Sequence, residues 1–218
     1  MISVLLFPLL AWFAQQGASR PQTGGGEIEL KLELRRGAQW QPVDVHTVFR
    51  AKDEIRFRFR TPFAGFLKVV NQSSDGRTSS LFPSGDGKQA SPVEANVEYL
   101  IPSGSGSFVV GGKPGFDLTE WVVSSLPLAG DWQPTAFLNE PSTLLPKCQE
   151  GDLKARRSCL DSRAGPAPIA ASKNQSAAAN APLTSPDLNF RSRDLSALIS
   201  VPDVSQKVVA YEFRVAHR

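Results

Sequence analysis

The chain alternates apolar and polar residues in two long stretches near its beginning. Glu27–Arg35 and Asp53–Arg60 each place a large apolar side chain at every second position and a charged one between. A period of two is typical of a β-strand that buries one face and exposes the other. Two such strands predict antiparallel pairing around one core.

Shorter apolar runs follow, separated by glycine and proline. They predict further strands at Gly65–Val70, Val97–Ile101, Phe108–Val110 and Trp121–Val123. Asp75-Gly76 marks a hairpin turn after the first of these, because glycine accepts a positive φ without steric cost. Many short strands at this spacing predict an all-β fold, an antiparallel β-sandwich-like domain over residues 27–126.

The pattern changes after this domain. Residues 127–186 contain recurrent prolines, and Ala164–Pro182 is rich in Ala, Pro, Ser and Asn with little to bury, so we expect a long Ala/Pro-rich insertion on the surface. In the C-terminal segment 187–218, Lys207–Val215 alternates again and cannot bury its apolar face alone. We therefore expect it to return as the last strand of the domain.

The first residues resemble a secretory signal. Ile2–Ala14 is apolar and uncharged, and it is shorter than the ~20 residues of a membrane span. A buried first strand or helix is the alternative, which Pro8 and the break at Thr23–Gly26 disfavour. Residues 1–18 are therefore predicted to be a signal peptide, with the chain periplasmic or secreted and no integral membrane span after leader removal.

Cys148 and Cys159 are the only cysteines, with ten residues between them. In an oxidising compartment they would form a disulfide, whereas two free thiols would fit a cytoplasmic protein; we favour the disulfide. Neither belongs to a C-x-x-C motif and the chain has two histidines, so no metal or cofactor is predicted.

The charge balance argues against a nucleic-acid partner, because 24 basic residues face 21 acidic ones. One basic row remains as a candidate site for a polyanion. Arg56, Arg58 and Arg60 project from one strand face at intervals of ~7 Å. The favoured alternative is a sheet face on which these arginines pair with Glu29 and Glu33 of the neighbouring strand.

Catalytic and ligand motifs fail their spacing tests. No Gly-x-Ser-x-Gly elbow is present, and only His46 and His217 are available as imidazole bases. Asn71–Gly76 has the beginning of a calcium loop, but the twelfth position, where a bidentate Glu is needed, is Phe82. A hairpin turn explains the segment, and the chain is predicted not to be an enzyme.

Several short pieces in order resemble the bacterial domain of unknown function 4384. They are Val48–Phe57, Gly65–Asn71, Ser74-Asp75-Gly76, Leu81-Phe82-Pro83, Tyr99–Pro102 and Pro114-Gly115, and they span about Leu34 to Ser125. One departure is Ala51-Lys52, where the family commonly has a glycine before the position of Asp53. The resemblance implies a bacterial domain that occurs beside enzymes or in exported proteins, and it implies no catalytic residue.

These observations predict an exported bacterial β-domain without catalysis, with a protein or an anionic envelope polymer as its partner. A hydrolase of unrecognised type is the first alternative, and it would have a deep pocket in which titratable side chains converge. An accessory partner of a separately encoded enzyme is the second.

Overall fold

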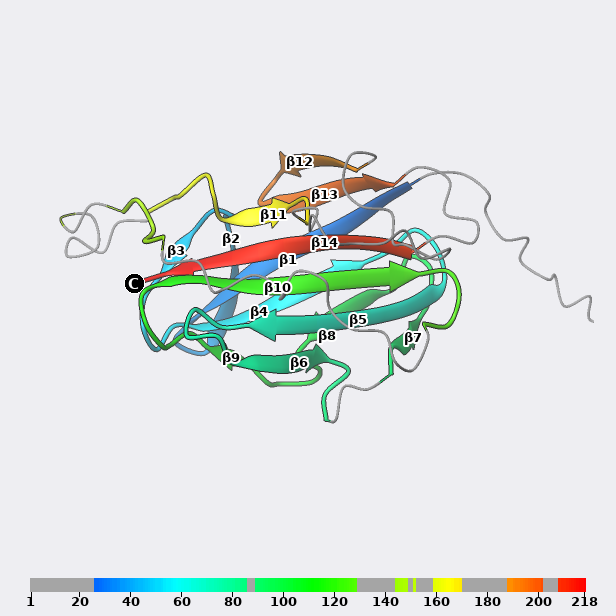
Figure 1. Cartoon of the computed structure of the whole chain (residues 1–218), viewed down its shortest axis with the longest axis horizontal. Helices are drawn as coiled ribbons and strands as arrows, with labels where there is room; N and C mark the ends of the chain where they lie inside the picture. The colour runs from blue at the N-terminus through cyan, green and yellow to red at the C-terminus, as the bar shows by residue number, and fades with distance from the viewer. Residues whose placement is uncertain are drawn as a thin grey trace, which may run out of the picture.

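The computed structural model describes residues 26–85, 89–128, 144–148, 151, 159–169, 188–201 and 208–218. The predicted signal peptide and most of the predicted insertion lie outside these ranges. Within them, two seven-stranded sheets pack face to face, as Figure 1 shows. The predicted all-β sandwich is therefore confirmed. The described ranges contain no helix that is long and apolar enough to span a membrane.

The first sheet has the order β12-β13-β1-β4-β8, with β2 beside β1 and β9 beside β4. Its strands are β1 (Gly26–Arg36), β2 (Gln39–Val43), β4 (Glu54–Arg60), β8 (Glu98–Ile101), β9 (Phe108–Val109), β12 (Asn189–Arg193) and β13 (Ser196–Val201). The two amphipathic strands read from the sequence are β1 and β4. They pair antiparallel, with Glu33 opposite Arg56 and Glu29 opposite Arg60.

The second sheet has the order β11-β14-β10-β5-β6, with β3 beside β14 and β7 beside β5. Its strands are β3 (Val48–Phe49), β5 (Gly65–Gln72), β6 (Thr78–Phe82), β7 (Ser91–Val93), β10 (Gly115–Ser124), β11 (Gly165–Ala167) and β14 (Val208–His217). β14 corresponds to the strand expected at Lys207–Val215. It pairs antiparallel with β10 along its full length, so the C-terminus supplies an interior strand of this sheet.

The core lies between the sheets and is built from the alternating positions. Apolar residues of β1 and β4 face those of β5, β10 and β14 in one continuous cluster. Trp121 of β10 is at its centre, stacked on Phe59 at 5.7 Å and on Tyr211 at 6.2 Å between ring centroids. Such aromatic pairs stabilise a core beyond the area that they bury.

Part of the predicted insertion belongs to the fold, which corrects the expectation that Ala164–Pro182 has little to bury. Gly165–Ala167 forms β11 and pairs with β14. Ile169 is buried against Val122 and Ala210 on the outer face of the second sheet. This face carries apolar residues, and Ile169 packs against two of them. Residues 170–187 lie outside the described ranges.

Candidate functional site: a groove between two sheet edges

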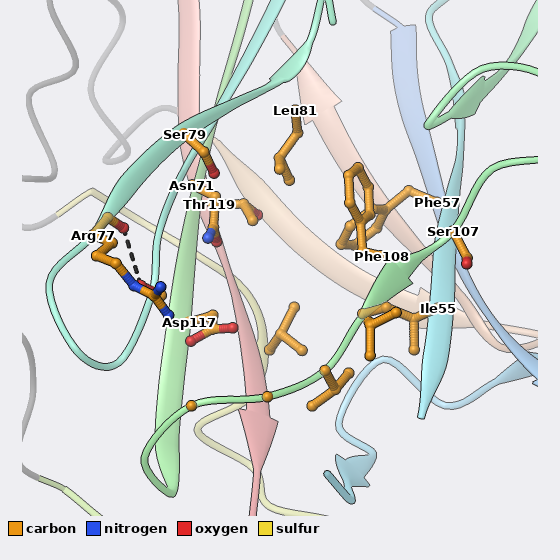
Figure 2. Close-up of a pocket in the computed structure, with 16 residues that line it drawn as sticks. Ile55, Phe57, Asn71, Arg77, Ser79, Leu81, Ser107, Phe108, Asp117 and Thr119 are labelled. Atoms are coloured by element: carbon orange, nitrogen blue, oxygen red, sulfur yellow. Dashed lines mark hydrogen bonds between the residues drawn. The ribbon is translucent and has the colours of Figure 1, made fainter. Parts of the chain in front are cut away.

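An open groove of about 410 Å³ lies where the edges of the two sheets approach each other. β4 and β9 of the first sheet form one wall, and β5, β6 and β10 of the second sheet form the other (Figure 2). Its volume is within the range of ligand-binding clefts, roughly 300–1,000 Å³. We call it the edge groove. Its lining includes Phe57, Ser79, Leu81, Phe108, Asp117 and Thr119.

The floor of the edge groove is apolar, because strand residues whose side chains face the core also line the open side of the sandwich. Phe57 is buried and meets Trp121 edge-on at 5.3 Å, so it is fixed by the core. The ring centroid of Phe108 in β9 lies 6.4 Å from that of Phe57, and Phe108 is only partly buried. Leu81 of β6 extends from the opposite wall, as Figure 2 shows. An occupant would therefore meet apolar and aromatic side chains at depth.

Asp117 is a charged residue of the groove wall, and its carboxylate already contacts neighbouring groups of the protein. Its Oδ1 accepts a hydrogen bond from the Ser74 backbone N–H at 2.7 Å and lies 3.2 Å from His217 Nε2. The Ser74 hydroxyl donates its hydrogen bond to the Lys113 carbonyl at 2.6 Å. The arrangement anchors the β5–β6 hairpin to β10, and it does not align a serine, a histidine and a carboxylate as a nucleophilic relay.

The second charged residue of the lining, Arg77, sits at the rim and is paired with its neighbour. Its guanidinium contacts Asp75 at 2.9 Å. Hydrogen bonds from Ser73 and then from Arg77 lower the pKa of Asp75 to about 2. The predicted hairpin turn is observed here, with Gly76 at a φ of 86°. Both charged residues of the lining therefore have partners of opposite charge or hydrogen-bond donors within the fold.

The three arginines of the candidate polyanion site lie on the outer face of the first sheet, each with a carboxylate partner. Glu33 accepts from Arg56 Nε at 2.5 Å and from Arg58 Nε at 2.6 Å, and Arg60 contacts Glu29 at 2.6 Å. Arg58 also contacts Glu98, and these carboxylates raise its pKa. This is the cross-strand pairing that the sequence reading favoured.

The face is less solvated than expected. Arg56 is only 7% exposed and Glu33 only 6%. Trp40 of β2 covers the guanidinium of Arg56, whose Cζ lies 4.3 Å from the ring centroid. A cation–π contact of this kind stabilises a charge that has lost water.

The predicted disulfide is present between Cys148 and Cys159. Its loop is also held by polar contacts, because Asp161 accepts from the backbone N–H of Lys147 at 2.6 Å and from Arg163. Hydrogen bonds from Arg163 keep the pKa of Asp161 well below its usual range. The Cys159 carbonyl accepts from the Val48 backbone N–H at 2.8 Å, which fastens the loop to β3.

A second set of buried charges lies on the outer face of the second sheet, where Glu120 is opposite Glu212 in the β10–β14 ladder. Burial lowers the pKa of Lys68 and raises that of Glu212, with Glu120 and Arg214 opposing these shifts. Perturbed groups of this kind occur at functional sites and in structural ion-pair networks alike. None of the four lines the edge groove.

Sequence reasoning identified the arginines and cysteines but missed the edge groove. Leu81 and Phe108 are ordinary strand residues, and nothing in their spacing shows that they face each other from different sheets. The one signal of the groove in the sequence was the shortness of the apolar run Phe108–Val109, because an apolar residue on a very short strand is expected to be partly exposed.

The comparisons with known proteins agree with the family resemblance. Residues 48–127 match the model of a family described as a domain of unknown function (DUF4384). No curated protein and no solved structure gives a significant match to the chain. The matched segment runs from β3 to just beyond β10 and contains every lining residue of the edge groove except Val215. Residues 48–127, which form almost the whole edge groove, are therefore similar to the DUF4384 family.

Proposed function

We propose that this chain is an exported, non-catalytic interaction module that holds a protein partner in the edge groove. The observation that carries the proposal is the composition of the groove, which has an apolar floor, a polar rim and charged groups already paired within the fold. Binding sites for partners combine such apolar depth with a few polar groups at the rim.

The absence of catalysis is part of this proposal. An enzyme needs a nucleophile, acid or base aimed at the space that the substrate fills. Within the described part of the groove lining, the titratable side chains are those of Arg77 and Asp117. Arg77 is paired with Asp75, and Asp117 is engaged by Ser74 and His217. The groove supports binding better than chemistry.

Two features support export. The apolar run Ile2–Ala14 has the length of a signal core, and the Cys148–Cys159 disulfide is compatible with an oxidising compartment. A polyanionic polymer is the weaker partner, because a polymer bound to Arg56, Arg58 and Arg60 would have to displace Glu29 and Glu33 from them.

Site-specific photo-cross-linking in the native cell tests the proposal. A benzophenone amino acid replaces Ser79, which is exposed and lines the groove, or Arg35, which is exposed on the outer face of the first sheet. We expect a discrete adduct from position 79 and none from position 35. An adduct only from position 35, equal labelling at both, or no adduct at either position would show that the groove is not the contact site.

A further inference from the structure

The sheet edges of this fold differ in how they are protected. Natural proteins place charges or prolines on edge strands, because unpaired backbone groups otherwise recruit other strands. Most edge strands in the described ranges follow this rule. The residues concerned are Pro42 on β2, Pro92 on β7, Glu98 on β8, Pro166 on β11, and Arg191 and Arg193 on β12.

β6 is the longest described edge strand that departs from this rule. Its sequence, Thr78 to Phe82, contains no charged residue and no proline. It pairs with β5 on one side, and no other described strand pairs with it. β3 and β9 also lack such residues, but each has two residues, and β3 is fastened at its edge to Cys159. Of the described edges longer than three residues, β6 alone is unprotected by sequence.

This unprotected edge borders the edge groove. Ser79 and Leu81 of β6 face the groove, whereas the alternate residue Thr78 is exposed and does not line it. Phe108 lies on the opposite wall (Figure 2). A strand added to β6 would continue the second sheet and would direct every second side chain toward this apolar space.

We propose that the occupant of the groove is an extended peptide segment of the partner, which pairs its backbone with β6 and places uncharged apolar side chains, at alternate positions, in the groove. Backbone groups of an open strand edge select a peptide, since main-chain hydrogen bonds supply the affinity in strand addition. The charged groups of the lining already have partners within the fold, because Arg77 is paired with Asp75 and Asp117 accepts from the Ser74 backbone N–H beside His217. The complementary segment is therefore uncharged. Five residues of β6, at about 3.3 Å each, would pair with a segment of similar length.

The inference rests on the proposed function and names the chemistry of the partner. Its test is selection of a phage-displayed library of random nine-residue peptides against the full chain, followed by binding measurements on synthetic copies of the enriched peptides. We expect enriched sequences with apolar residues at alternate positions. Ser79→Lys should weaken their binding at least tenfold, because it places a charge at the groove and beside the added strand.

Thr78→Lys is the matched control, because it adds the same charge to the same strand on the other face, and it should change affinity less than twofold. Thermal unfolding of both variants checks folding, since both positions are exposed. N-methylation of the peptide backbone at alternate amides supplies a second readout. Methylation at one set of positions should weaken binding at least tenfold, and methylation at the intervening set should not.

Three results would overturn the strand-addition inference: no enrichment, enriched peptides without alternation, or binding that tolerates N-methylation at every position. Equal losses for Ser79→Lys and Thr78→Lys would overturn it as well. The two proposals fail separately. A protein photo-adduct at position 79 together with any of these results would leave the groove as the site of the protein partner and overturn only the added peptide strand.

Discussion

Lys52 adopts a φ of 75°, a left-handed conformation that side chains with a Cβ disfavour. It follows Ala51 in the turn before β4, and its backbone N–H donates to the Val110 carbonyl at 2.8 Å. The turn therefore fixes β9, and with it one wall of the edge groove. The family resemblance places a glycine near this point, and the backbone gives a physical reason for one.

Replacing Lys52 by glycine should stabilise the protein. Relief of the left-handed strain is worth about 1–2 kcal/mol, and the greater freedom of glycine in the unfolded chain offsets about 0.5–1 kcal/mol of it. We expect a net gain of about 0.5–1 kcal/mol in the free energy of unfolding, measured by urea denaturation. Ala51→Gly, in the same turn but without a positive φ, should lower it. A loss of stability in Lys52→Gly would contradict this account.

At the scale of the elements, β1 and β4 are joined by their side chains as well as by their backbones. Glu33 forms ion pairs with two arginines and is nearly excluded from water. One of them, Arg56, is equally buried, beneath the ring of Trp40. Removing one member of such a group is costly, because the charge left behind has lost its water and its partner. The exposed members of the same row contribute far less.

Glu33→Gln should therefore lower the free energy of unfolding by about 3 kcal/mol, within the range for broken buried pairs. Glu98→Gln removes a carboxylate from the same arginine row, but Glu98 has a side-chain exposure of 44%, and its loss should cost less than about 1 kcal/mol. Equilibrium denaturation of both variants compares them directly. Similar small losses would show that the pair around Arg56 behaves as a solvated surface contact.

Alternation made β1, β4 and β14 predictable, because each buries one face and the side-chain period of a strand is two. The β12–β13 hairpin escaped prediction because its turn, Asp194-Leu195, has positive φ values of 49° and 64° without a glycine to signal them. β11 escaped because Gly165-Pro166 reads as a loop. The short strand Phe108–Val109 hinted at an exposed apolar residue, but the edge groove itself was not predictable, since its size depends on the distance between two sheet edges.

At the scale of the whole molecule, the family segment does not complete the sandwich. Residues 48–127 supply neither β1 nor β14, which are interior strands of the two sheets. β14 lies between β10 and β11, and β1 lies between β4 and β13. Residues on both sides of the family segment therefore complete the core. The disulfide loop is attached to the family segment at β3, where the Val48 backbone N–H donates to the Cys159 carbonyl.

The disulfide loop is held by a covalent bond and by hydrogen bonds. Replacing both cysteines by serine should leave the sheets formed, because hydrogen bonds from Lys147 and Arg163 to Asp161, and from Val48 to Cys159, still hold the loop. The free energy of unfolding should fall by about 3 kcal/mol, since the unfolded chain regains the freedom that the cross-link removes. Urea denaturation measures the loss, and circular dichroism checks the sheets.

Reductant provides the internal control for this experiment. It should shift the wild-type denaturation midpoint toward that of the double serine variant and leave the variant unchanged. In the native cell, the proposed export predicts that thiol trapping finds Cys148 and Cys159 oxidised, because export would take the chain to an oxidising compartment. Two free thiols in the cell would contradict export. The loop would then be held by polar contacts alone, chiefly those of Asp161, which accepts hydrogen bonds from the backbone N–H groups of Lys147 and Arg163.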